Sequence, residues 1–262
     1  MQQALIMGQD EITKKWLPIR YNRGALDVYI QDQNSELVNW LVHQDLNDIV
    51  LAEHATVDSR TIELQAGHNV VTGNLISLLQ DTKFYQGIVT NVNVNTITLD
   101  TPIDQQFRTD RDYTATRGNA NLAVDGSGTS QYFHVQPPPA SSWDITELVV
   151  YMTDDATMDD TKLGGIAAVT NGMVVRKKNT VYNNIGNIKS NGNLKAVGCD
   201  VVYAEKSGGG EYSMQGVCEF SSDAGITIRL DGRLNEELEV IIQDDIDAIT
   251  SITIAVIGHV VE

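Results

Sequence analysis

The chain is poor in basic residues, in aromatic residues and in cysteine. Its 262 residues include 18 Lys and Arg against 35 Asp and Glu, and aromatic residues make up 6%. The resulting formal charge of −17 opposes binding to nucleic-acid phosphates and to anionic lipid. We therefore expect no direct sequence-specific binding of nucleic acid.

Long apolar runs are also missing. No stretch of about 18 uncharged apolar residues occurs, so no transmembrane helix is predicted. Residues 1–8 have neither the basic nor the apolar region of a secretory signal. We expect a chain that is made in the cytoplasm and does not associate with a membrane.

Cysteine occurs twice, at Cys199 and Cys218. Both lie in strand-like surroundings, and neither has a neighbour at the spacing of metal ligands. The pattern favours two buried free thiols on paired strands over a disulfide.

Short strand patterns fill the C-terminal half of the chain. Apolar and polar residues alternate in 226–230 and 251–257, as expected of strands with one buried face. The three prolines at 137–139 must end a strand. We predict an all-β protein whose residues 117–262 form a β-sandwich of jelly-roll or Greek-key type. Its expected strands are 131–135, 143–153, 172–177, 197–204, 212–220, 226–230, 238–242 and 252–259.

Residues 57–116 predict a second, smaller β unit. Five short strands are expected at 61–64, 75–79, 83–92, 96–99 and 112–116, with a hairpin between the third and the fourth. This number and spacing are typical of a small SH3-like or OB-like barrel. Its interior is expected to hold Phe84, Ile88, Val92, Ile97 and Leu99.

Residues 1–56 predict an extended N-terminal arm, because short strand-like pieces alternate there with polar segments. The segment carries four aromatic residues that we consider candidates for contacts with another subunit: Trp16, Tyr21, Tyr29 and Trp40. The alternative is an arm that folds back on its own sandwich.

A cluster of carboxylates is the candidate metal site. Asp154, Asp155, Asp159 and Asp160 could offer oxygen ligands to Ca²⁺, although the spacing differs from that of an EF-hand loop. The alternative is a short helical turn with Asp at its start and Gly164 and Gly165 at its end. No other cofactor is expected.

Motifs of catalysis are missing from the sequence. The five histidines, His43, His54, His68, His134 and His259, stand singly, without the spacing that directs two imidazoles at one metal. Nucleophile elbows, phosphate-binding loops and dinucleotide fingerprints do not occur. We expect a protein that is not an enzyme.

Three segments resemble structural proteins of tailed bacteriophages: Phe-His-Val-Gln-Pro-Pro-Pro at 133–139, Trp-Asp-Ile-Thr-Glu-Leu at 143–148 and Gly-Ile-Thr-Ile-Arg-Leu-Asp-Gly at 225–232. The segment 240–261 continues the resemblance, which covers most of residues 57–262. The resemblance implies a virion component present in several copies, with itself and other virion proteins as partners.

Within the particle, a head-to-tail connector or collar protein of the neck is the first expectation, and a head decoration or a tail or baseplate component is the alternative. A different kind of function is a carbohydrate-binding or receptor-binding module, in which Tyr151, Tyr182 and Tyr203 would stack on a host-surface glycan.

Overall fold

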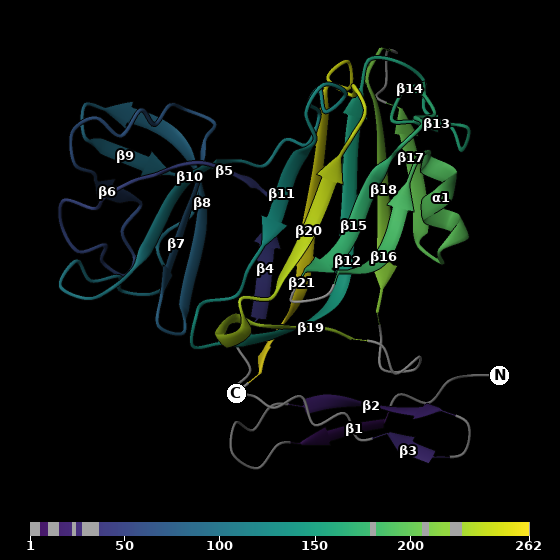
Figure 1. The fold of residues 1–262 in the computed structure, drawn as a ribbon. Coiled ribbons are helices and arrows are strands. Elements are labelled where there is room, and N and C mark those ends of the chain that lie inside the picture. Colours follow the sequence, from purple (N-terminus) through teal and green to yellow (C-terminus); the bar gives the residue numbers. More distant parts are fainter. Residues whose placement is uncertain are drawn as a thin grey trace. The chain divides into compact units, whose positions relative to one another are not determined.

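The computed structural model describes residues 37–178, 182–205, 210–220 and 227–261, together with the backbone of three strands near the N-terminus. The chain divides into two compact units, residues 1–36 and 37–262. In the first unit, β1 (Ile6–Gln9), β2 (Trp16–Asn22) and β3 (Ala25–Asp27) form an antiparallel sheet in that order (Figure 1).

The second unit contains a sandwich of two antiparallel sheets (Figure 1). One sheet has the order β11 (Gln131–Val135), β20 (Glu237–Ile242), β15 (Met173–Lys178) and β16 (Asn183–Ile188). The other has the order β17 (Asp200–Glu205), β18 (Tyr212–Glu219), β12 (Ser142–Asp154), β21 (Ser251–Val261) and β4 (Leu37–Leu41), with β19 (Ile228–Asp231) also paired to β12. The predicted all-β, antiparallel class is confirmed.

Alternating side chains of the two sheets build the sandwich core. In β21 every second residue from Ile252 to Val256 is fully buried, and Leu148, Val150 and Met152 of β12 lie in the same core. The strand β11 ends just before the three prolines, as their missing N–H groups require.

A smaller lobe, residues 44–119, consists of one six-stranded antiparallel sheet. Its order is β5 (Gln44–Asp48), β10 (Thr114–Asn119), β7 (Leu75–Gln80), β8 (Lys83–Asn93), β9 (Thr96–Leu99) and β6 (Thr61–Glu63). The segments that continue β5 and β6 also pair, because Ala52 N–H donates to Glu63 O and Gln65 N–H donates to Val50 O, both at 2.8 Å. The expected hairpin between β8 and β9 is confirmed.

The interior of the small lobe differs from the prediction at β8. Ile97 and Leu99 are buried in it as expected, but Tyr85 and Val89 fill the places assigned to Phe84 and Ile88. Phe84 belongs to the core of the sandwich, and Ile88 is 38% exposed. Both faces of β8 carry apolar residues, so alternation alone could not show which face points inward.

The small lobe is inserted into the sandwich. The chain leaves the sandwich after β4, forms the lobe and returns to the sandwich at β11. The sequence predicts an arm over residues 1–56, but residues 37–48 belong to the sheets of the second unit. Trp40 is 2% exposed and packs edge-on against Trp143 and Phe84, at ring-centroid distances of 5.5 and 5.8 Å. For Trp40, the structure favours the alternative in which the segment packs on its own sandwich.

Short elements complete the sandwich: β13 (Lys162–Leu163), β14 (Ile166–Ala167), α1 (Asn191–Ala196) and the 3₁₀ turn η1 (Gly232–Leu234). Gly164 and Gly165 join β13 to β14 as a tight turn, with Gly164 at a φ of +56°, so they do not end a helix. Within the described part of the chain, no helix has the length and apolar character needed to cross a membrane.

Cys199, which directly precedes β17, and Cys218 of β18 form a disulfide, with their Cα atoms 4.2 Å apart. The expectation of two free thiols on paired strands was wrong, although β17 and β18 do pair next to the two cysteines. Sequence spacing could not decide between the two states, because both need the same strand pairing.

Candidate functional site

Two histidines distant in sequence face each other where the small lobe joins the sandwich. His43 precedes β5 and His134 lies in β11, and the two form an isolated antiparallel bridge. Their backbones exchange both hydrogen bonds, His43 N–H to His134 O at 3.1 Å and His134 N–H to His43 O at 2.7 Å. Directly opposed residues of antiparallel strands project to the same side, so the two rings lie together, with their centroids 5.1 Å apart.

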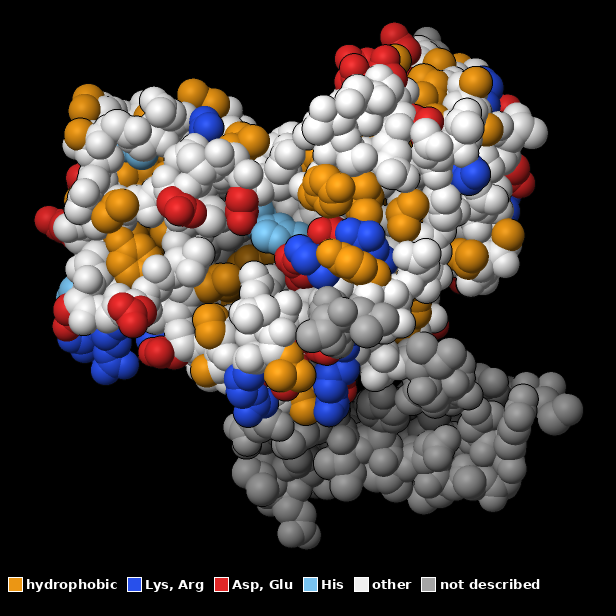
Figure 2. Space-filling model, in the orientation of Figure 1, with side chains coloured by type: hydrophobic (Ala, Val, Ile, Leu, Met, Phe, Trp, Pro, Cys, Tyr) orange, Lys and Arg blue, Asp and Glu red, His pale blue; other side chains and the backbone are white. Residues whose placement is uncertain are grey.

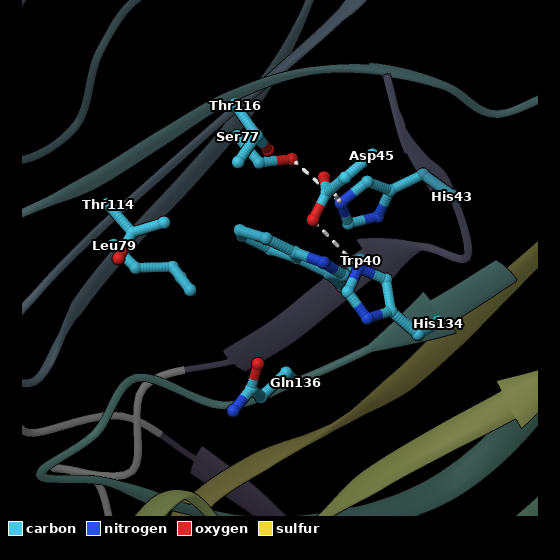
Figure 3. Close-up of a pocket in the computed structure, with 9 residues that line it drawn as sticks. All are labelled: Trp40, His43, Asp45, Ser77, Leu79, Thr114, Thr116, His134 and Gln136. Atoms are coloured by element: carbon cyan, nitrogen blue, oxygen red, sulfur yellow. Dashed lines mark hydrogen bonds and ion pairs between the residues drawn. The ribbon is translucent and has the colours of Figure 1, made fainter. Parts of the chain in front are cut away.

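Asp45 lies between the two rings (Figure 3). It is two residues after His43, and the alternation of an extended segment places both side chains on one side. Asp45 Oδ1 is 3.3 Å from His43 Nε2, and Asp45 Oδ2 is 3.2 Å from His134 Nε2. One carboxylate therefore contacts both imidazoles, each through its Nε2 atom.

The opposite ring nitrogens are held by other groups. His134 Nδ1 donates to Glu237 Oε2 of β20 at 2.9 Å. His43 Nδ1 lies 3.1 Å from Leu41 O and 3.2 Å from Gln86 Nε2, so it can donate to the carbonyl or accept from the amide. The Ser77 hydroxyl of β7 lies 3.3 Å from His43 Nε2.

The cluster shifts the ionisation of its members. Burial alone would lower the pKa of His134, but its hydrogen bonds to Asp45 and Glu237 raise this pKa to about 9. Burial would raise the pKa of Asp45, but hydrogen bonds from His134 and His43 hold it well below its usual range. Burial would also raise the pKa of Glu237, but its hydrogen bonds with His134 and Lys178 lower this pKa. His134 is therefore a cation between two anions.

A small cavity opens beside the cluster (Figure 3). It has a volume of about 50 Å³ and is lined by Trp40, His43, Asp45, Ser77, Leu79, Thr114, Thr116, His134 and Gln136. A water molecule needs roughly 10–15 Å³ of such space, so the cavity admits a few waters or an ion and is too small for a sugar ring. Figure 2 shows histidine atoms in a hollow of this face, beside adjoining acidic and basic side chains.

Near the histidine cluster, charged side chains form cross-strand pairs on the four-stranded sheet. Glu237 and Glu239 of β20 are nearly buried, and Lys178 and Arg176 of β15 lie directly opposite them in the register. Arg176 Nε donates to Glu239 Oε2 at 2.6 Å, and Lys178 pairs with Glu237. Because Glu237 also holds His134, the charges connect β15 through β20 and β11 to the small lobe.

The four aspartates considered as candidate Ca²⁺ ligands do not converge. Asp154 is buried and accepts from the N–H groups of Asp155 and Gly165, at 2.8 and 2.9 Å. Asp159 accepts from Thr161 N–H and Oγ1, and Asp160 accepts from Lys195 and Tyr203. In the described residues, the group of three or more side chains that could share an ion is instead His43, Asp45 and His134.

The three tyrosines that the alternative, a carbohydrate-binding module, would use do not form one surface. Tyr151 and Val202 both lie opposite Gln215 in the register, on the exposed face of the sheet. Tyr203 lies opposite the buried Met214. Tyr151 and Tyr203 therefore point to different faces. The ring of Tyr182 is covered by the Arg176 guanidinium, 3.9 Å from its centroid.

The remaining contact candidates lie in the N-terminal unit. Trp16 and Tyr21 belong to β2, whose side chains the structure does not describe, and Tyr29 lies outside the described residues. They stay predictions.

Sequence reasoning missed the histidine cluster. His43 and Asp45 share the spacing of one strand face, which is a weak signal, and His134 is far away along the chain. The pairing of β4 with the sandwich and of β5 with the small lobe brings His43, Asp45 and His134 together.

Comparison of the chain with protein-family models, with curated proteins and with solved structures finds no match.

Proposed function

We propose that this chain is a non-enzymatic structural component of a tailed-phage virion, present in several copies, with the head-to-tail connector or collar as its place. The proposal starts from the resemblance of segments 133–139, 143–148, 225–232 and 240–261 to such proteins. Head decoration and a tail or baseplate position are the alternatives within the same class.

The separate N-terminal unit carries the proposal. Residues 1–36 form a unit apart from 37–262, and its sheet has three strands of four, seven and three residues. A sheet this small does not bury enough apolar surface to be stable alone, so it needs another surface to pack on. A neighbouring subunit supplies such a surface in a permanent assembly.

The fold of the second unit suits a particle component. We infer that the small lobe is an SH3-like or OB-like barrel, because the bonds between segments 50–52 and 63–65 join the two ends of its sheet order. We infer a jelly-roll or Greek-key class for the sandwich, since the chain crosses repeatedly between its two sheets. Two buried cores in one body provide a rigid platform for contacts between subunits.

Removal of the N-terminal unit tests the proposal. A variant that begins at residue 37 keeps every strand of the second unit, so we expect the same melting temperature as the full chain. It should remain a monomer in light scattering under conditions where the full chain forms oligomers, and it should be absent from particles made in its presence. Assembly of the truncated chain at the full-length stoichiometry would refute the proposal.

A longer deletion is the matched control. A variant that begins at residue 49 also loses β4 and β5, and with them Trp40, one edge of the larger sandwich sheet and one edge of the small-lobe sheet. This variant should fail to fold. Comparison with the variant that begins at residue 37 therefore distinguishes loss of the fold from loss of assembly alone. A map of the native particle would then decide between neck, head and tail.

A further inference from the structure

We propose that His43, Asp45 and His134 bind a divalent transition-metal ion, best suited to Zn²⁺, at the junction between the small lobe and the sandwich. Their potential ligand atoms all lie within 4.8 Å of one another. Imidazole nitrogen and carboxylate oxygen are ligands that Zn²⁺ accepts together in one site.

The spacing of the ligand atoms fits a tetrahedral ion. Bonds of about 2.0 Å place neighbouring ligand atoms about 3.3 Å apart around tetrahedral Zn²⁺. The distances from the Asp45 carboxylate are 3.3 Å to His43 Nε2 and 3.2 Å to His134 Nε2. Each imidazole nitrogen is thus about one ligand edge from an oxygen of the same carboxylate, His43 from Oδ1 and His134 from Oδ2, and a small rotation of the Asp45 side chain would let one oxygen serve both edges.

Each imidazole is oriented as a metal ligand is. A ligating histidine usually donates its second N–H to a carboxylate or to a backbone carbonyl. Here His134 Nδ1 contacts Glu237 at 2.9 Å and His43 Nδ1 contacts Leu41 O at 3.1 Å. Both Nε2 atoms are thereby directed at Asp45.

Metal binding exchanges a proton for the ion. A Zn²⁺ ion bound by His134 Nε2 replaces the proton on that atom, which is released to solvent.

The fold preorganises the site and leaves it accessible. The paired backbones of His43 and His134 fix two ligands before an ion arrives. Asp45 has a side chain that is 38% exposed, and the cavity beside it has room for a water as fourth ligand. An ion bound here joins a ligand that precedes β5, one within β5 and one within β11, and so ties the lobe to the sandwich.

Zinc titration of the metal-free full chain tests the proposal. After chelator treatment and dialysis, calorimetry with Zn²⁺ should give one site per chain. Zn²⁺ at 100-fold above its Kd should raise the melting temperature by about 5–10 °C. Co²⁺ in place of Zn²⁺ should give the visible absorption of a four-coordinate nitrogen and oxygen site.

Substitutions assign the ligands. His134→Gln and Asp45→Asn should each abolish the calorimetric site and the Co²⁺ spectrum. Glu237→Gln should leave one site of about 10–100-fold lower affinity, because it removes the partner of a ligand and no ligand. His259→Gln is the control, since His259 is in β21, outside the cluster, and its variant should bind Zn²⁺ as the parent does.

Three results would overturn the proposal. They are no Zn²⁺ binding by the parent chain, Zn²⁺ binding that survives both His134→Gln and Asp45→Asn, or an equal loss of Zn²⁺ binding in His259→Gln. Should His134→Gln fail to fold, Asp45→Asn decides alone, because Asp45 is a surface residue whose loss leaves the strand pairs intact.

Discussion

Cross-strand ion pairs connect neighbouring strands of the sandwich. One of them joins Asp144 on β12 to Arg229 on β19. The two residues are directly opposite in the register, and the guanidinium contacts both carboxylate oxygens, at 2.7 and 2.8 Å. Hydrogen bonds from Arg229 lower the pKa of Asp144, against the effect of its burial.

This pair predicts a dependence of stability on pH. The folded pKa of Asp144 lies below its unfolded value of about 3.9, so its contribution is complete above that pH and is lost as the pH falls through the folded pKa. Asp144→Asn should lower the free energy of unfolding at pH 7 by about 1 kcal/mol, because Arg229 is largely exposed. Urea unfolding at pH 7 and pH 3 should show a smaller difference between the variant and the parent at pH 3. The exposed Asp155→Asn is the control, and an equal loss there would contradict the assignment.

Val94 occupies a backbone conformation that disfavours it. It lies in the turn between β8 and β9 with a φ of +55°, and its side chain is 80% exposed. A β-branched residue is strained in the left-handed region, whereas Asn tolerates it. Val94→Asn should therefore raise the free energy of unfolding by about 0.5–1 kcal/mol in chemical denaturation. Val71→Asn, at another exposed valine without this φ, should give no gain.

The disulfide predicts a measurable redox effect. Cys199 and Cys218 close a loop with a sequence separation of 19, for which chain entropy gives about 3 kcal/mol of stabilisation. In denaturant without reductant, the oxidised chain should show no thiol that reacts with a thiol reagent. Reductant should lower the melting temperature of the parent and leave that of Cys218→Ser unchanged. Two reactive thiols in the non-reduced, air-equilibrated chain would contradict the pairing.

Among the elements, β8 connects the two cores of the second unit. Tyr85 and Val89 point into the small lobe, while Phe84 points to the sandwich and contacts Trp143 at a centroid distance of 4.9 Å. The register shifts between Val89 and Asn91, and this irregularity brings Val92 back to the inner face.

Phe84→Ala should make the small lobe and the sandwich unfold in separate thermal transitions. Loss of the buried ring should destabilise the chain by about 3–4 kcal/mol and should split a single thermal transition into two, followed by calorimetry. Ile88→Ala, on the same outward face but 38% exposed, should cost less than about 1 kcal/mol and keep one transition. A similar loss of stability in both variants would argue against Phe84 as the specific contact between the small lobe and the sandwich.

The strands could be predicted from sequence where local pattern decides them. The predicted strand 131–135 coincides with β11, and the predicted strand 143–153 differs from β12 by one residue at each end, because period-two alternation and proline mark both clearly. The strand β4 in the sandwich sheet and the inner face of β8 could not be predicted, since both depend on partners far away in the sequence. The same reason hid the site: carboxylate-rich turns are visible locally, whereas His43 and His134 meet only through tertiary pairing.

At the scale of the whole molecule, the small lobe should be an independent folding unit. Residues 44–119 contain all six strands of its sheet and nearly all of its own buried cluster. Expressed alone with Phe84→Ser to remove the exposed ring, this segment should give a cooperative thermal transition and a dispersed amide spectrum. A collapsed spectrum without a transition would show that the lobe requires the sandwich.

The pairing of β4 with β21 sets an order of events during synthesis. Leu37–Leu41 leaves the ribosome before the small lobe, but its partner strand, with Leu41 opposite Ala255, emerges only after the other described strands of the second unit. The small lobe can fold while later strands are still being translated, whereas Val38 and Trp40 remain uncovered apolar surface until β21 has emerged. The vulnerable period of this protein is therefore its translation, and a slow ribosome or a truncated message would leave that strand open to aggregation.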